Sequence, residues 1–312
     1  MSSMVRATIV RALRFDYRRL WFAFGRTALA LATLSELLFT RSGALFTRVG
    51  PAVGPLCSAQ PKVSLFCLAG QYEFLEARRW LAIVLLLVVA SGYRPRYLTI
   101  VHLWVVYSVT TSVTLPDGGD SIALIVVCLI TPMCLADQRR WHWTAPARLM
   151  GRDGRTIAYL SFWALRLQIA YLYADSAIAK MGVADWQNGS AFYYFIRDKM
   201  FGSADPLSPL WVWLSDQSLV TLTVTWGAIV AELAIALFVL LDARWRLAAF
   251  GLAVALHALI FLTMGLFSFS LVMAAVAALI ATPNELTARR PRSRFPGKHQ
   301  AAENDSRLPE AG

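Results

Sequence analysis

Residues 159–189 read YLSFWALRLQIAYLYADSAIAKMGVADWQNG, and this stretch decides the fold. Its first part is an apolar run long enough to enter a membrane. The same run carries four polar or charged side chains, namely Arg166, Gln168, Asp175 and Lys180. Because charged groups are costly inside hydrocarbon, such residues usually face a partner, a cavity or a reaction centre. The stretch therefore predicts a membrane helix that does more than anchor the chain in lipid.

The composition of the whole chain is that of a membrane protein. Of the 312 residues, 57% are hydrophobic and 16% are charged. Soluble domains contain about 45–50% apolar and about 25% charged residues. Several segments of about 16–24 residues carry few charges, which is typical of membrane helices. We therefore predict an all-α, polytopic integral membrane bundle, and the composition excludes an ordinary soluble protein.

The hydropathy pattern predicts eight transmembrane helices within one domain, residues 20–282. We expect them at 20–39, 77–93, 97–115, 120–136, 157–181, 218–241, 245–264 and 266–282. The first is too long for an ordinary cleavable signal core, so we interpret it as a signal-anchor helix. Residues 1–19 form a basic N-terminal segment. Residues 283–312 are polar, basic and proline-bearing, which predicts a disordered tail.

The placement of positive charge predicts the topology. Of the 30 Lys and Arg residues, twenty lie in the N-terminal segment, the even-numbered connections and the tail. Seven lie in the other connections, and three lie within the spans. The positive-inside rule then puts both termini in the cytoplasm and residues 41–79, 116–119 and 182–217 outside. A net charge of +11 that is gathered at helix ends also argues against nucleic acid as a partner.

The charges of the fifth helix fall on two faces. At 100° per residue, Arg166 and Lys180 lie within about 40° of one another, whereas Asp175 lies about 140° from Lys180, on the face of Gln168. Asp175 and Lys180 are therefore not a simple pair within the helix. We expect each to find a partner elsewhere in the bundle.

Depth in the membrane suggests partners on other helices. Glu232 and Arg166 each lie about nine residues from the cytoplasmic ends of their helices, so we expect them to pair. Glu36 lies at about the level of Lys180, and His257 lies near mid-depth in the seventh helix. These side chains either line a polar pocket or form ion pairs that only fix the packing.

Two of these residues have sharper alternatives. In a pocket of low dielectric, Lys180 loses its charge readily and can act as a base, or it can snorkel to the outer interface. His257 is either a proton carrier or a packed hydrogen-bonding group. The four histidines lack the spacing of metal ligands, so we expect no metal site.

The outer connections hold further candidates. Asp117 and Asp120 flank two glycines in LPDGGDS, residues 115–121, which is typical of a tight turn but offers two carboxylates to a cation or a basic peptide. Cys57 and Cys67 lie in one outer loop, where the compartment permits a disulfide.

Aromatic residues are concentrated in the outer segment 182–217. They are Trp186, Phe192, Tyr193, Tyr194, Phe195, Phe201, Trp211 and Trp213. Such residues favour the membrane–water interface. We expect one or two helices that lie in the outer leaflet surface and cap the polar pocket. The aromatic side chains form either a plain interfacial belt or a docking surface for a lipid or an amphipathic peptide.

Several motifs carry a family resemblance that spans roughly residues 20–283. They are LRLQIAYLYADSAIAKMGVADWQNG at 165–189, SLFCL at 64–68, VASGY at 89–93, DGGD at 117–120, and His257 followed by MGLFS at 264–268. Together they resemble the HTTM family of membrane proteins, whose best-known enzyme is the vitamin K-dependent gamma-carboxylase. Within that family the chain is most similar to the bacterial sporulation-delaying protein B group.

The resemblance implies two different activities. In the carboxylase, a lysine of this motif is taken as the base that deprotonates the reduced quinone, and Lys180 occupies the matching place. The sporulation-delaying protein B group acts with a partner protein to mature a secreted peptide toxin. The chain lacks the large extra-membrane domain that follows the helices in the carboxylase, which argues against carboxylation.

Three hypotheses follow for a multi-pass protein of the bacterial cell membrane. The first is a factor that matures or exports a toxin-like peptide, with a peptide precursor and a small protein as partners. The second is a membrane oxidoreductase or carboxylase that uses a quinone, with Lys180 as base and His257 or Glu232 assisting. The third is a transporter or immunity protein whose path is lined by Arg166, Asp175 and Glu232. The third is weaker because the chain shows no inverted repeat.

Overall fold

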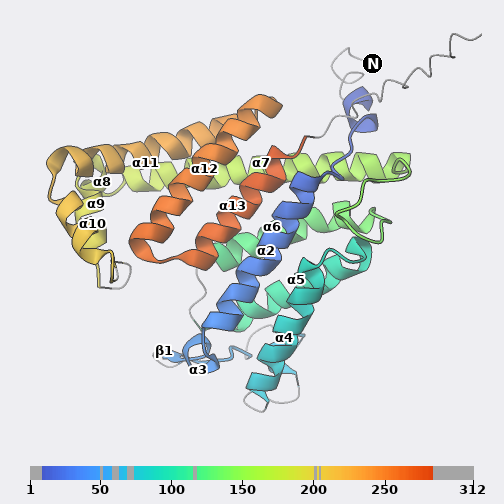
Figure 1. Cartoon of the computed structure of the whole chain (residues 1–312), viewed down its shortest axis with the longest axis horizontal. Coiled ribbons are helices and arrows are strands. Elements are labelled where there is room, and N and C mark those ends of the chain that lie inside the picture. The colour runs from blue at the N-terminus through green and yellow to red at the C-terminus, as the bar shows by residue number, and fades with distance from the viewer. Residues whose placement is uncertain are drawn as a thin grey trace, which may run out of the picture.

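Eight helices lie where the sequence predicts membrane segments (Figure 1). This computed structural model describes residues 9–49, 52–57, 63–68, 74–114, 118–199, 202–203 and 205–283. The eight helices are α2 (Leu20–Phe39), α4 (Leu75–Ala90), α5 (Pro95–Ser112), α6 (Gly118–Leu135), α7 (Arg152–Met181), α11 (Ser218–Phe238), α12 (Ala243–Met264) and α13 (Phe267–Ala281). Helix α7 begins five residues earlier than expected, because its first turn is polar and escapes a hydropathy pattern.

Four of these helices, α2, α6, α11 and α12, are long and apolar enough to cross a membrane. Helix α13 is apolar but has only 15 residues, and α4 has 16. The chain is thus a helical membrane protein, while the count of eight spans and the orientation of the termini stay predictions. One feature departs from an all-α fold: β1 (Arg48–Val49) and β2 (Ala52–Val53) form an antiparallel ribbon of two residues each.

Helix α13 lies at the centre of the bundle. It packs against α2, α12, α6 and α7, and alanines supply many of its buried positions. Small side chains let helices approach closely, which favours such packing in membranes. At Gly25 of α2, an added Cβ would lie 2.7 Å from Leu279 Cγ and 2.9 Å from the Ala275 carbonyl oxygen. The α2–α13 contact therefore requires glycine at position 25.

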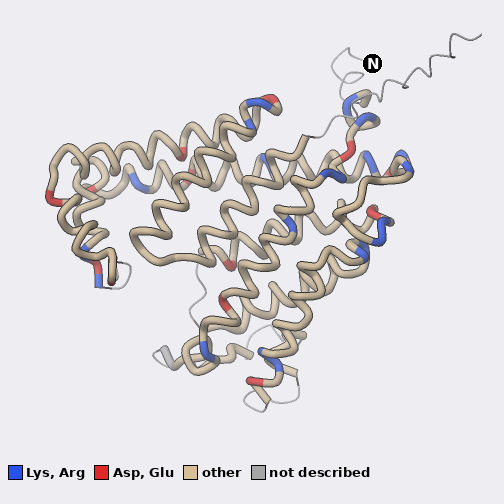
Figure 2. The backbone as a smooth tube through the Cα atoms, in the orientation of Figure 1, with Lys and Arg blue, Asp and Glu red and all other residues tan. Residues whose placement is uncertain are grey.

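Two apolar clusters meet at α2. The larger lies among α2, α6, α7, α11, α12 and α13, and the smaller lies among α2, α4, α5 and the 3-10 helix η1 (Leu65–Cys67). Most basic positions lie at helix ends and in connections, as Figure 2 shows. The long helices alternate in direction, so the N-terminal segment and the 136–151 connection lie on one side of the molecule, opposite α3 (Ser42–Leu45) (Figure 1).

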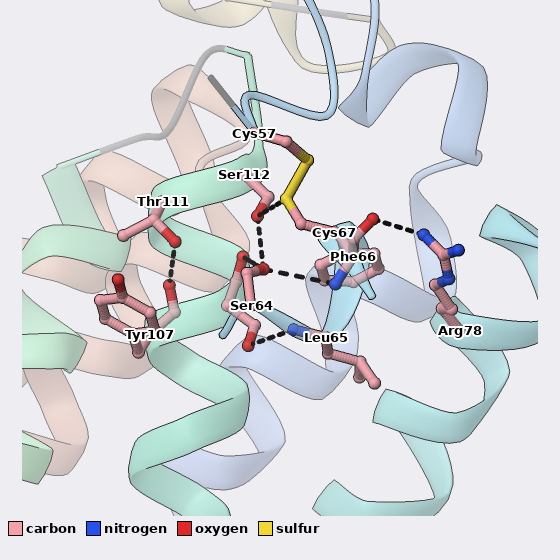
Figure 3. The surroundings of a disulfide bond; sticks show 10 residues. Cys57, Ser64, Leu65, Phe66, Cys67, Arg78, Tyr107, Thr111 and Ser112 are labelled. Carbon is pink, nitrogen blue, oxygen red and sulfur yellow. Dashed lines mark hydrogen bonds between the residues drawn. A yellow bond between two sulfur atoms is a disulfide. The ribbon is translucent and has the colours of Figure 1, made fainter. Parts of the chain in front are cut away.

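A disulfide closes the loop that precedes α4. Cys57 and Cys67 are joined, with Cα atoms 5.7 Å apart (Figure 3). The Ser108 hydroxyl accepts a hydrogen bond from the Leu65 amide at 2.9 Å, and Arg78 Nη1 donates to the Phe66 carbonyl oxygen at 2.6 Å. The SLFCL motif thus ties the loop to α4 and α5, which is a structural role.

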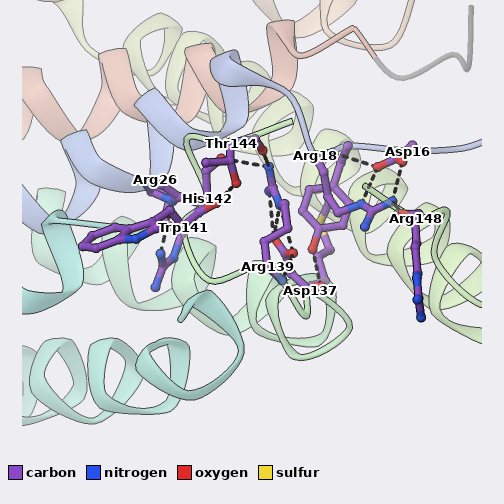
Figure 4. A network of polar contacts seen from close by, with 11 residues as sticks. Asp16, Arg18, Arg26, Asp137, Arg139, Trp141, His142, Thr144 and Arg148 are labelled. Atoms are coloured by element: carbon purple, nitrogen blue, oxygen red, sulfur yellow. Dashed lines mark hydrogen bonds and ion pairs between the residues drawn. The ribbon is translucent and has the colours of Figure 1, made fainter. Parts of the chain in front are cut away.

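On the side of the molecule opposite this disulfide, a polar network joins the N-terminal segment to the 136–151 connection (Figure 4). Arg18 Nη2 pairs with Asp16 Oδ2 at 2.8 Å and donates to the Arg148 carbonyl oxygen at 2.9 Å. Burial alone would raise the pKa of the Asp16 carboxyl, but the hydrogen bonds and the charge of Arg18 outweigh burial and lower that pKa. Arg139 pairs with Asp137 at 2.7 Å.

The same network holds a histidine next to a buried arginine. Arg26 Nη1 lies 3.2 Å from His142 Nδ1, and the His142 amide donates to the Gly92 carbonyl oxygen at 3.0 Å. Gly92 has φ of +82°, and an added Cβ there would lie 2.1 Å from the His142 ring. The VASGY motif therefore forms a turn that receives His142 and fixes the connection against the bundle.

Candidate functional site

The main cavity lies between α7, α11, α12 and α13, beneath α8 (Ala184–Gln187) and α9 (Ala191–Ile196). Its volume is about 370 Å³. Most of its wall is aliphatic or aromatic. The polar or amphipathic side chains in the wall are Tyr173, Ser176, Lys180, Trp186, Thr225, Glu232, His257 and Thr263.

Lys180 and Glu232 form an ion pair in this wall. Lys180 Nζ donates to Glu232 Oε1 at 2.7 Å and to Glu232 Oε2 at 2.9 Å. It also donates to Ser176 Oγ at 2.6 Å, and Ser176 Oγ donates to Glu232 Oε1 at 3.1 Å. The indole ring of Trp186 lies 5.2 Å from Nζ, within the range of a cation–π contact. The lysine is therefore held from α7, α8 and α11 together.

Helical spacing places three polar groups of α7 in the cavity. Tyr173, Ser176 and Lys180 are separated by three and four residues, so they share one face of the helix. That face packs against α11, which supplies Glu232. The sequence could have identified Tyr173 and Ser176 from this spacing alone, starting from Lys180.

A second polar pair lies in the same wall. Tyr173 Oη lies 3.1 Å from His257 Nε2, and the edge of the His257 ring meets Phe269. His257 is only 4% exposed, and its Nδ1 atom has no hydrogen-bond partner within the described residues. Buried polar atoms without a partner are uncommon. The Nδ1 atom is therefore a buried ring nitrogen in the wall residue His257 that the described residues leave without a partner.

Short helices cover the cavity on the side of the aromatic segment. The Phe192 amide donates to Thr225 Oγ1 at 3.1 Å, which fixes α9 to α11. Trp211 Nε1, in α10 (Ser208–Ser215), donates to the Leu262 carbonyl oxygen at 2.8 Å. Gly189 has φ of +80°, a conformation that suits glycine at the turn between α8 and α9. The segment thus caps the cavity, as the sequence predicts.

One predicted pairing is wrong. Glu232 pairs with Lys180 and not with Arg166. Arg166 instead donates from Nε to the Val239 carbonyl oxygen at 2.7 Å and from Nη2 to the Leu241 carbonyl oxygen at 2.9 Å. The expectation assumed that the start of the fifth helix and the end of the sixth, which lie on the same side in the predicted topology, are at one level. Lys180 is next to last in α7 whereas Glu232 is the 15th residue of α11, so the two helices are offset.

The other predicted residues do not line the cavity. Asp175 is exposed and Gln168 is half-buried on α7, and Glu36 is half-buried on α2. Asp120 is buried near the start of α6, where its carbonyl oxygen accepts a hydrogen bond from Thr110 Oγ1. Asp117 lies outside the described residues. Within the described part of the chain, no group of three His, Cys, Asp or Glu residues is placed to hold a metal ion.

Comparison with known proteins places the cavity within a recognisable domain. The HTTM domain matches residues 81–284. The chain is 32% identical over 228 residues to the uncharacterized protein YitO of Bacillus subtilis, covering 71% of this chain and 73% of that protein. It is 30% identical over 181 residues to the sporulation-delaying protein SdpB of the same organism, covering 57% and 56%. No solved structure matches the chain. The domain match includes every residue that lines the cavity.

Proposed function

Because this chain belongs to the HTTM family and to the group of sporulation-delaying protein B, we propose that it takes part in the maturation or export of a secreted, toxin-like peptide. The observation that carries the proposal is the Lys180–Glu232 pair in an apolar cavity beneath an aromatic cap. A secreted peptide reaches its final form at or beyond the membrane. A site near the outer face, as the charge distribution predicts, suits that task.

The dimensions and chemistry of the cavity limit what can enter it. A volume of about 370 Å³ suits a small ligand or a few side chains and not a whole folded peptide. The apolar wall favours hydrophobic side chains, while Lys180 and Glu232 offer one positive and one negative group to polar atoms. We therefore expect a short hydrophobic segment of the peptide to enter.

The cap supplies a surface for the rest of the peptide. Tyr194 is 55% exposed and Trp213 is 60% exposed on the helices that cover the cavity. Exposed aromatic groups at an interface bind apolar and amphipathic segments. In this arrangement the cap receives the peptide and the cavity receives its inserted residues.

Deletion and complementation in the source organism test this proposal. Loss of the gene should abolish the mature form of a secreted peptide, as measured by mass spectrometry of culture supernatants. Wild-type protein should restore it, and Lys180→Ala at equal membrane abundance should not. Lys199→Ala is the matched control, because Lys199 is exposed in the same outer segment and does not line the cavity. An unchanged set of secreted peptides in the deletion strain would refute the proposal.

A quinone-dependent oxidoreductase or carboxylase is the second candidate function, and an apolar wall that carries the polar groups of Tyr173, Lys180 and His257 favours it. A quinone supplies two-electron redox chemistry when bound. The apolar wall and the donors Lys180 and Tyr173 fit such a ring and its oxygen atoms. Lys180 Nζ donates to Glu232 Oε1 at 2.7 Å, so a cation and a carboxylate lie side by side at the cavity wall.

Purification in nanodiscs with added menaquinone separates the two functions. Stoichiometric quinone that is lost in Lys180→Ala would support the redox function. Purified protein that binds no quinone, together with unchanged activity of Lys180→Ala, would count against it.

A further inference from the structure

A second cavity, of about 360 Å³, lies between the first half of α7, the turn from α11 to α12 and residues 10–15. Its wall holds four arginines and one acid, namely Arg11, Arg14, Arg166, Arg246 and Asp242. Figure 2 shows that the described N-terminal segment carries basic positions above the bundle. The excess of cations in this wall contrasts with the balanced pair in the main cavity.

Two of these arginines are fixed in place by the ends of helices. Arg166 and Arg246 are each 4% exposed. Arg166 donates to carbonyl oxygens that follow α11, and Arg246 Nε donates to the Ile280 carbonyl oxygen of α13 at 3.0 Å. The C-terminal ends of helices carry partial negative charge and stabilise such cations. The two guanidinium groups are therefore rigidly placed.

Arg166, Arg11 and Arg14 retain capacity for an anion. A guanidinium has five N–H donors, and Arg166 uses only Nε and Nη2 for hydrogen bonds within the described residues. It forms no ion pair there with a carboxylate. The side chains of Arg11 and Arg14 are exposed and form no hydrogen bond or ion pair in the same part of the chain. One carboxylate, that of Asp242, balances only part of this charge.

The rest of the wall is apolar and aromatic. Val10, Leu240 and Leu241 lie beside Tyr159 and Trp163, and Trp163 stacks on the Arg166 guanidinium at 3.9 Å. Tryptophan and tyrosine favour the membrane–water interface. A wall that combines arginines with apolar side chains at this level suits a molecule with an anionic head and an apolar body.

We propose that this cavity binds the phosphate-bearing headgroup of an anionic phospholipid. Arg166 and Arg246 form the floor of the site, and Arg11 and Arg14 reach the headgroup from the N-terminal segment. The charge distribution assigns this side to the cytoplasm, where the leaflet is anionic and basic pockets between helices bind lipid headgroups. Guanidinium groups also match the geometry of phosphate oxygens.

Lipid titration of the purified full chain tests the proposal. The protein is reconstituted in nanodiscs of phosphatidylcholine, and phosphatidylglycerol is added while bound lipid is measured by native mass spectrometry. We expect phosphatidylglycerol to bind at least tenfold more tightly than phosphatidylcholine. The Arg11→Gln/Arg14→Gln variant should lose this preference by on the order of 5-fold per arginine. Both positions are exposed, so the fold is preserved.

The matched control is Arg140→Gln/Arg152→Gln, which removes two exposed cations from the same side but outside the cavity. It should bind phosphatidylglycerol as the wild type does. Equal binding of the two lipids, or equal losses in both double variants, would overturn the proposal. Inorganic phosphate distinguishes the source of the anion. If millimolar phosphate binds the wild type but not the Arg11→Gln/Arg14→Gln variant, and phosphatidylglycerol does not displace it, the site belongs to a soluble phosphate and the lipid assignment is wrong.

Discussion

The two halves of α7 each carry a cation in the interior, and the two cations have different partners. In the second half, Lys180 faces the Glu232 carboxylate across 2.7 Å, so the main cavity contains a balanced pair. In the first half, Arg166 faces the carbonyl oxygens of Val239 and Leu241, which carry only partial charge. One cavity is therefore apolar and close to neutral, and the other is cationic. The same helix thus lines two cavities of different charge.

Breaking the Lys180–Glu232 pair has the largest expected effect. Glu232→Leu leaves the Lys180 cation largely buried without its carboxylate, and removing one partner of a buried pair costs about 3–5 kcal/mol. Lys180→Met/Glu232→Leu removes both charges and should recover most of the unfolding free energy. The measurement is thermal unfolding of the purified protein in detergent.

Peptide maturation by the same variants then shows whether the Lys180–Glu232 pair has a functional role or only a packing role. We expect the double variant to be stable and yet unable to mature the peptide. If it is both stable and fully active, the pair only fixes α7 against α11, and the proposed site is wrong.

The sequence predicts the helices well because their apolar runs are long and their connections are marked by charge. It also singles out Lys180, which lines the cavity. It misses the partner of Lys180, since the offset between α7 and α11 is set by the tertiary fold. Hydropathy and depth contain no information about that fold.

Asp175 shows a second limit of sequence reasoning. The cost of a charge in hydrocarbon predicts that an acid in a membrane helix faces the interior, yet Asp175 is exposed on α7. It lies six residues before the end of the helix, where side chains can reach toward the interface. Remote groups such as Thr225 and Phe192 enter the site only through the tertiary fold, so no local pattern could have found them.

Replacing Arg166 has an intermediate expected effect and sharpens the contrast with Lys180. Arg166→Met removes two charge-assisted hydrogen bonds to carbonyl oxygens at the end of α11. We expect a loss of about 3 kcal/mol in unfolding free energy, which is two hydrogen bonds to a charged group at about 1.5 kcal/mol each, the low end of their usual contribution. Unfolding in detergent measures the loss. Peptide maturation, normalised to protein in the membrane, should stay near the wild-type level, unlike in Lys180→Ala. A loss of peptide maturation in Arg166→Met at a wild-type level of protein in the membrane would show that both halves of α7 belong to one site.

The smallest expected effect is a pH dependence on the cationic side, at His142. Burial, followed by the charges of Arg26 and Arg139, lowers the pKa of His142 to about 3. In the unfolded chain its pKa is about 6.5, so the unfolded state takes up a proton first as the pH falls. The folded state therefore loses stability below about pH 6.5, and at pH 5.5 the loss is about 1.4 kcal/mol.

The His142→Gln variant tests whether His142 is the source of this pH dependence of stability. A glutamine side chain cannot gain a proton, so the variant should lose less stability than the wild type between pH 7.5 and pH 5.5, as measured by Tm in detergent. The carboxyl of Asp16 has a lowered pKa, so it releases its contribution only at more acidic pH, outside this window. The Lys180→Met/Glu232→Leu variant should keep the wild-type pH slope, because His142 belongs to the opposite side of the bundle. Parallel Tm curves for wild type and His142→Gln would show that His142 takes up its proton equally in both states, contrary to its close contact with Arg26.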